Sequence, residues 1–177
     1  MEATLTPDYD ALMHAAIASA SNHQKWLESK FEGVKVVSNT AVGTVGQDFV
    51  ESLCNALILE HDFPMSAGKR LSQNPWDIRI LDKTFELKTA TEDTSGCFQF
   101  NHIRYHRPYD AVLCIGIAPN DIMFDCWSKA DIVTGKAGRL NSMEAGANAS
   151  YKLTKRRITL HPIAEFEQRV RALIAQL

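Results

Sequence analysis

A nearly continuous apolar run, residues 109–118 (Tyr-Asp-Ala-Val-Leu-Cys-Ile-Gly-Ile-Ala), constrains the fold more than any other feature of the sequence. Successive side chains of a strand point to opposite faces of a sheet, so this run predicts a strand buried on both faces. Residues 122–127 follow a Pro-Asn turn and predict another strand. We therefore expect a sheet covered on both sides.

Residues 76–90 alternate between apolar and polar side chains with a period of two. Trp76, Ile78 and Ile80 form the apolar set of the first half, and Asp82-Lys83 separates it from an alternating second half. This pattern predicts a β-hairpin with one apolar face.

Apolar residues at three- and four-residue steps predict helices over residues 7–31 and 45–61. Ser128 is expected to cap a short helix, Pro162 to open a last one, and residues 157–160 to form a short strand. Residues 134–150 are rich in Gly, Ala, Ser and Asn and are expected to form a long loop. The 177 residues suit a single α/β domain, with a central four- or five-stranded mixed sheet flanked by helices.

Charge is distributed unevenly along the chain. The formal net charge of −2 argues against a histone-like protein that holds nucleic acid by bulk charge. Residues 1–65, however, contain nine acids and three bases, so basic residues are concentrated in the remainder. This asymmetry is compatible with a local basic surface for an anionic partner.

Neither a membrane span nor a metal-binding cysteine motif is predicted. No apolar run approaches the roughly 18 residues that cross a bilayer. The N-terminus lacks the features of a secretion signal, so we expect a cytoplasmic protein. The four cysteines contain no C-x-x-C pair and indicate neither zinc nor a disulfide framework.

The predicted hairpin carries three charged residues that suit phosphodiester chemistry. Glu86 and Lys88 are two residues apart and therefore share a face of their strand. With a turn at Asp82-Lys83, Asp77 is expected opposite Lys88, which would bring the three side chains together at one end of the hairpin.

Two converging carboxylates repel each other unless a divalent cation bridges them, and Mg²⁺ prefers such oxygen ligands. An amine beside the cation can orient a water or neutralise charge on a phosphate. The alternative is an exposed strand face with a salt bridge from Asp77 to Lys88.

Asn74-Pro75-Trp76-Asp77, followed by Phe85-Glu86-Leu87-Lys88-Thr89, resembles the PD-(D/E)XK nuclease superfamily, and is most similar to small type II restriction endonucleases. The resemblance covers about residues 40–133 and implies a restriction-endonuclease-like fold. It implies that Asp77 and Glu86 are metal ligands and that Lys88 is the catalytic lysine. Trp76, between the proline and the aspartate, departs from the motif.

Members of this superfamily usually carry another acid on the helix before the hairpin. We choose Glu51 as this catalytic and metal-binding carboxylate, with Asp48 and Gln47 as lesser candidates. A solvated helix acid is the alternative interpretation of Glu51.

Several polar and basic residues are candidates for holding DNA. Gln99 and Asn101 follow the strand that carries Glu86 and Lys88, and their side chains can form hydrogen bonds with a phosphate or a base edge. An equally plausible interpretation is that they are loop residues whose polar groups bond to neighbouring groups of the protein. Phosphate contacts are expected from Lys69, Arg70, Arg104, Arg107, Lys155, Arg156 and Arg157.

The leading hypothesis is a Mg²⁺-dependent endonuclease acting on double-stranded DNA, of restriction type. A chain this short can place only one active site, so cutting both strands implies a homodimer. A Holliday-junction resolvase, a repair nuclease and a homing nuclease of the same fold remain alternatives. So does a non-catalytic DNA-binding protein in which Asp77, Glu86 and Lys88 form a salt-bridge cluster.

Overall fold

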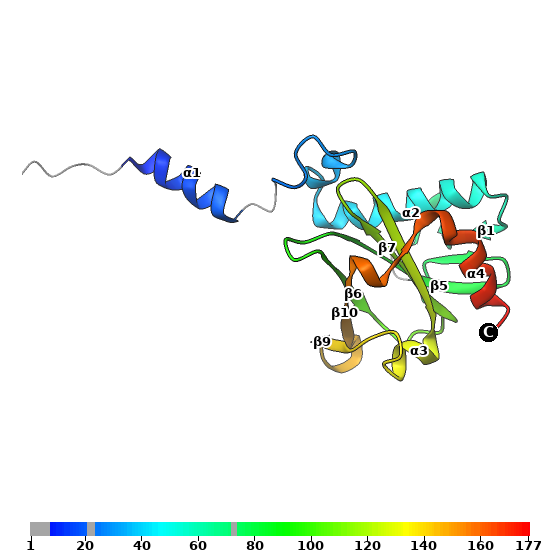
Figure 1. Cartoon of the computed structure of the whole chain (residues 1–177). Helices are drawn as coiled ribbons and strands as arrows, with labels where there is room; N and C mark the ends of the chain where they lie inside the picture. The colour runs from blue at the N-terminus through cyan, green and yellow to red at the C-terminus, as the bar shows by residue number, and fades with distance from the viewer. Residues whose placement is uncertain (1–7, 21–23, 72–73) are drawn as a thin grey trace, which may run out of the picture.

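A six-stranded mixed sheet forms the centre of the protein in a computed structural model that describes residues 8–20, 24–71 and 74–177 (Figure 1). Its strand order is β1-β4-β5-β7-β8-β11. Strands β5 and β7 are parallel, and the other neighbours are antiparallel. The strand bounds are β1 His61–Asp62, β4 Ile78–Ile80, β5 Lys83–Thr91, β7 Ala111–Ile117, β8 Ile122–Ser128 and β11 His161–Pro162.

The expected mixed sheet flanked by helices is confirmed. Strand β7 is buried at every position, as its apolar run predicts. The two outermost strands, β1 and β11, have two residues each and extend the four principal strands to six.

The hairpin of β4 and β5 is also confirmed, but its register differs from the expected one by two residues. Ile80 pairs with Lys83, so Leu81-Asp82 forms the turn instead of Asp82-Lys83. Leu81 adopts a φ of 54°, which a two-residue hairpin turn requires. Asp77 therefore lies opposite Glu86, with its N–H donating to the Phe85 carbonyl at 2.9 Å, and not opposite Lys88. A shift of two residues leaves every side chain on its expected face.

One face of the sheet packs against two helices, α2 (Asn39–Ala56) and α4 (Phe166–Ile174), which follows a 3₁₀ turn at Ile163–Glu165. Val50 and Cys54 of α2 and Phe166 of α4 are fully buried in this core. Figure 1 shows both helices beside the sheet. Phe85 and Leu87 of β5 belong to the same hydrophobic core between the sheet and these helices.

The opposite face is covered by a second sheet and by one short helix. The second sheet is antiparallel, in the order β6 (Cys97–Ile103), β10 (Ser150–Arg156) and β9 (Leu140–Glu144). Ser128 caps α3 (Lys129–Val133) as expected, its Oγ accepting from the Asp131 N–H at 3.0 Å.

Three predicted connections and strands are corrected here. The expected loop 134–150 contains β9 and a 3₁₀ turn at Gly146–Asn148, because β10 offers an edge for pairing. Gln99 and Asn101 lie on strand β6 and not in a loop. The strand expected at residues 157–160 is a 3₁₀ turn, Arg157–Thr159, that follows β10.

The N-terminal part differs from the predicted helices. Helix α1 spans Tyr9–Ala20, whereas the prediction extended it from 7 to 31; position 7 and residues 21–23 lie outside the described residues. Trp26 is fully buried among turns, before a 3₁₀ turn at Glu32–Lys35. Helix α2 begins six residues before the expected Val45, because Ser38 caps it by accepting from the Ala41 N–H at 3.2 Å.

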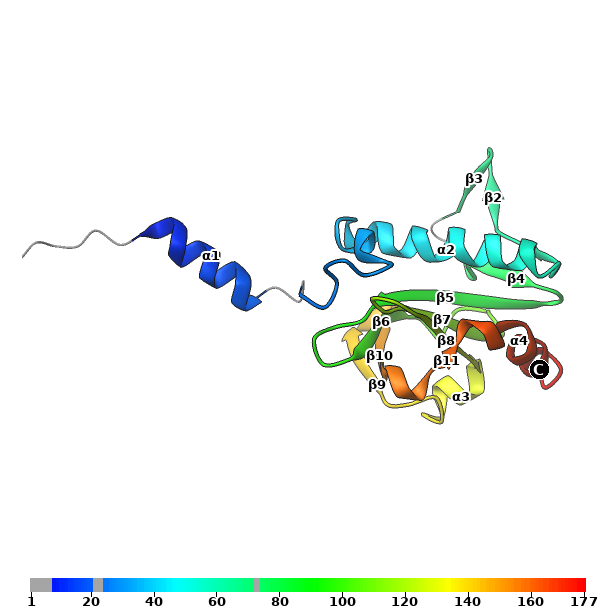
Figure 2. The ribbon, with the colours of Figure 1, turned by 45° about the horizontal axis from the view of Figure 1, so that its top comes forward.

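A small hairpin of β2 (Met65–Ser66) and β3 (Lys69–Arg70) projects from the body beside α2 (Figure 2). Among the described helices, none is long and apolar enough to cross a membrane.

Candidate active site

Strand β5 separates its charged side chains from its core side chains by simple alternation. Phe85 and Leu87 are buried against α2, so Glu86 and Lys88 point to the opposite face, toward β6. Asp77 directly precedes β4, lies opposite Glu86 when the register of the hairpin is continued by one residue, and therefore faces the same side. The structure thus brings the three predicted residues together.

The three side chains are held by short, specific contacts. The Lys88 ammonium lies 2.7 Å from Glu86 Oε1. Glu86 Oε2 accepts from the Arg104 backbone N–H at 3.1 Å, and Asp77 Oδ2 accepts from the Leu87 N–H at 2.8 Å. Glu86 is only 2% exposed, so its carboxylate is held in place within a nearly dry environment.

Two opposing influences act on the Asp77 carboxyl. Burial, first, and the charge of Glu86 raise its pKa, while Lys88, the Leu87 N–H bond and Arg107 lower it, and the net effect is an increase. Ionised Asp77 is therefore disfavoured in the protein without a bound cation.

This raised pKa predicts how stability depends on pH. Because Asp77 has a higher pKa in the folded state than in the unfolded state, its protonated form favours folding. This contribution to stability is complete below the pKa of an ordinary aspartate and is lost as pH rises through the higher pKa of the folded state. Asp77→Asn removes the titration and should gain stability relative to the wild type as pH rises from about 4 to 7. Urea unfolding of both proteins across this pH range measures the difference. A constant difference would contradict the buried position of Asp77.

A second group of residues borders the acids. Tyr109 is buried with its hydroxyl beside Glu86, and burial raises its pKa. The Lys129 ammonium lies 5.1 Å from the Tyr109 ring centroid and donates to the Arg107 carbonyl at 2.5 Å. Arg107 donates to the Asn74 carbonyl at 3.1 Å. Sequence reasoning missed Tyr109 and Lys129, which are polar residues at the ends of apolar strands and carry no motif.

Glu51 does not join this site. Arg70 binds both Glu51 and Asp48 at 2.5 Å, and these two acids lie on α2, on the other side of the central sheet. Within residues 8–20, 24–71 and 74–177, no three Asp, Glu, His or Cys side chains are grouped so as to hold one metal ion. The predicted three-carboxylate set is therefore reduced to Asp77 and Glu86.

The predicted DNA contacts on the second sheet face outward from β6 and β10. Gln99 and Asn101 are exposed, and Lys152 donates to Gln99 Oε1 at 3.4 Å. Arg156 is exposed at the end of β10. These side chains are available to a large ligand.

Other predicted cations are already engaged within the protein. Arg104 pairs with Glu144 at 3.6 Å, and Lys155 donates to the Ala137 carbonyl at 2.8 Å. Arg157 pairs with Asp121.

Lys69, by contrast, is an exposed cation on the projecting β2–β3 hairpin.

Asp77 and Glu86 fit a divalent cation by their chemistry. Both present carboxylate oxygens on one face, and burial, together with the charge of Glu86, raises the pKa of Asp77, so a bound cation would favour its ionised form. Glu86 Oε1 is buried and contacts Lys88 without a well-directed hydrogen bond. Hard oxygen donors of this kind suit Mg²⁺, which completes its coordination with water.

The sequence matches no protein-family model and no curated protein. Among solved structures, the chain is similar to the bacterial homing endonuclease I-Ssp6803I, with a TM-score of 0.46 and 8% sequence identity. The alignment covers 80% of this chain and 99% of the homing endonuclease.

Proposed function

We propose that this protein is a Mg²⁺-dependent DNA endonuclease of the PD-(D/E)XK kind. The observation that carries the proposal is the convergence of Asp77, Glu86 and Lys88 on one face of the β4–β5 hairpin. Two acids that can hold a cation, with an amine beside them, suit the hydrolysis of a phosphodiester.

Asp77 and Glu86 would hold the cation, and Mg²⁺ there would stabilise charge on the phosphate and make a water more acidic. Lys88 would orient the attacking water and neutralise charge that develops on the phosphate. Arg104 holds Glu86 in position through its N–H, and Leu87 does the same for Asp77. The water adds to phosphorus, and the sugar oxygen that leaves takes up a proton.

Double-stranded DNA is the proposed substrate. The exposed Lys69 and Arg156 would contact phosphates, and Gln99 and Asn101 would face the same ligand. Two copies of the chain would supply one active site for each strand, as in a restriction enzyme.

Cleavage of supercoiled plasmid tests the proposal. Nicked or linear DNA should form with Mg²⁺ and not with EDTA. Binding without cutting, in any divalent cation, would favour the non-catalytic alternative, in which the 2.7 Å pair of Lys88 and Glu86 is purely structural. A digest of long linear DNA then separates the nuclease classes: discrete fragments indicate a restriction or homing enzyme, whereas cutting confined to branched DNA indicates a resolvase.

A further inference from the structure

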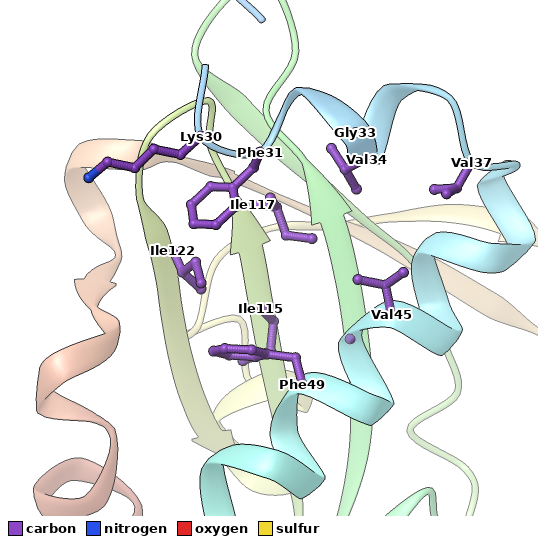
Figure 3. A pocket seen from close by; sticks show the side chains of 11 residues that line it. Lys30, Phe31, Gly33, Val34, Val37, Val45, Phe49, Ile115, Ile117 and Ile122 are labelled. Atoms are coloured by element: carbon purple, nitrogen blue, oxygen red, sulfur yellow. The ribbon is translucent and has the colours of Figure 1, made fainter. Parts of the chain in front are cut away.

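Two buried side-chain hydroxyls of the described residues have no hydrogen-bond partner, and they lie on opposite faces of the central sheet. Thr89 Oγ1 faces α2 and lies close to Gly46, which lines an apolar pocket of about 420 Å³ together with Phe49 (Figure 3). The Tyr109 hydroxyl, by contrast, is buried beside the Glu86 carboxylate. This second hydroxyl therefore borders the proposed cation site.

The backbone around Tyr109 is fixed to the strand that carries Glu86. The Asp110 N–H donates to the Thr84 carbonyl at 2.9 Å, and Asp110 Oδ2 accepts from the N–H and from the hydroxyl of Thr84, each at 2.8 Å. On its other side, the Tyr109 N–H donates to the Arg107 carbonyl at 3.0 Å. Because Thr84 is two residues before Glu86 on β5, these bonds fix Tyr109 relative to that carboxylate.

The ring of Tyr109 is enclosed, so its hydroxyl has little freedom to find another partner. The residue is 4% exposed and belongs to the core beneath the second sheet, and the Lys129 ammonium lies 5.1 Å from the ring centroid. A tyrosine hydroxyl is protonated at neutral pH, and burial, first, and then the charge of Glu86 raise its pKa further. Toward a carboxylate it therefore acts as a donor.

Glu86 has acceptor capacity left for such a donor. Its Oε2 accepts from the Arg104 N–H at 3.1 Å. Its Oε1 is buried, lies 2.7 Å from the Lys88 ammonium and receives no well-directed hydrogen bond. A carboxylate oxygen has two lone pairs, so one oxygen can bind a cation and accept from a donor at the same time. Donors in this position orient the carboxylates that bind metal ions.

We propose that Tyr109 is a positioning residue of the proposed cation site, whose hydroxyl donates to Glu86 Oε1 in the cation-bound protein and holds that carboxylate in place. Hydrogen bonds of this kind are often poorly aligned in a free enzyme and tighten in its complexes. The inference rests on the proposed function, because it requires a cation at Asp77 and Glu86. It adds a residue that lies outside the motif of two acids and a lysine.

Mn²⁺ binding to the full-length chain, measured by isothermal titration calorimetry, tests the inference. Mn²⁺ prefers the same hard oxygen ligands as Mg²⁺, and Glu86→Gln should abolish its binding at this site. Tyr109→Phe should raise the dissociation constant about 10- to 100-fold, the usual effect of losing a group that orients a metal ligand.

Tyr151→Phe is the matched control, because it also removes only a tyrosine hydroxyl. Tyr151 lies on β10, and its hydroxyl accepts from the Tyr105 hydroxyl at 2.9 Å, so it already has a partner. The affinity of this variant for Mn²⁺ should equal that of the wild type.

Urea unfolding in EDTA separates positioning from a general effect on folding. Tyr109→Phe should be at least as stable as the wild type there, because phenylalanine fills the same space and buries no donor without a partner. Weaker Mn²⁺ binding at undiminished stability is a result that a purely structural role for Tyr109 does not produce.

Four outcomes would overturn the inference. Equal Mn²⁺ affinity of the wild type and Tyr109→Phe would do so while leaving the proposed function intact. An equal loss of affinity in Tyr151→Phe, or a Tyr109→Phe variant that is less stable in EDTA, would indicate a general effect on the core. A wild type that binds no Mn²⁺ at Glu86 would remove the proposed cation site and this inference together.

Discussion

Lys88→Met is expected to reduce the rate of DNA cleavage about 10³-fold or more while DNA binding persists, the size of effect that follows loss of a positioned acid–base or electrostatic group. The reason is the position of the ammonium, which lies 2.7 Å from Glu86 with only 18% of its side chain exposed. Methionine keeps the length of the side chain and removes its charge. Single-turnover cleavage with Mg²⁺ measures the rate, and fluorescence anisotropy with Ca²⁺ measures binding.

Lys83→Met is the matched control for this experiment. Lys83 is the first residue of the same strand, pairs with Asp82 at 3.4 Å and is 24% exposed. It is three residues from Glu86, so strand alternation places its side chain on the opposite face. Its variant should cut at nearly the wild-type rate. If Lys88→Met also cuts at that rate, the role assigned to Lys88 is wrong.

Substitution of two acids, one inside the proposed site and one outside it, gives a second comparison of cleavage rates. Glu86→Gln should lose cleavage as Lys88→Met does, whereas Glu51→Gln should retain it, since Glu51 is bound by Arg70 on the other side of the sheet. Loss of cleavage in Glu51→Gln at unchanged stability would restore the original prediction that Glu51 belongs to the metal site.

Gly46→Ala is expected to destabilise the protein by about 3 kcal/mol or more, at the upper end of overpacking costs. Gly46 lies where α2 crosses β5, and a Cβ atom there would fall 1.7 Å from Thr89 Oγ1 and 2.7 Å from Thr89 Cβ. The helix and the strand must separate to accept the methyl group, which disturbs the core on which the β4–β5 hairpin rests. Urea unfolding followed by circular dichroism measures the change.

Gly43→Ala is the control in the same helix. A Cβ atom at Gly43 meets nothing within 4 Å, so alanine should stabilise α2 by about 0.5–1 kcal/mol through its higher helix propensity. The double variant Gly46→Ala/Thr89→Gly should recover part of the lost stability by removing the obstructing side chain. Equal effects of the two glycine substitutions would show that the close contact of α2 with β5 is absent.

The central strands and the hairpin were predictable because their signals are local. The alternation in residues 76–90 gives the face of each side chain, and this assignment survives the error in turn position because the register moved by two residues. The apolar run of β7 likewise determines burial without knowledge of its neighbours.

Features that depend on distant partners were not predictable. Gly46 is typical of a loop in sequence, but in the structure it permits close packing of α2 on Thr89, 43 residues later. Strand β9 forms because β10 pairs with it. Glu51 lies on the helix before the hairpin, where the sequence predicts a metal-site acid, yet Arg70 from the projecting hairpin binds it. None of these contacts leaves a periodic signal in the sequence.

Anomalous diffraction from crystals soaked in Mn²⁺, which binds to hard oxygen ligands as Mg²⁺ does, tests the cation site most directly. The predicted result is one strong peak in contact with both Asp77 and Glu86, which disappears in Glu86→Gln and persists in Glu51→Gln. Ordered crystals of the wild type with no peak at these two carboxylates, or with Mn²⁺ bound only elsewhere, would contradict it.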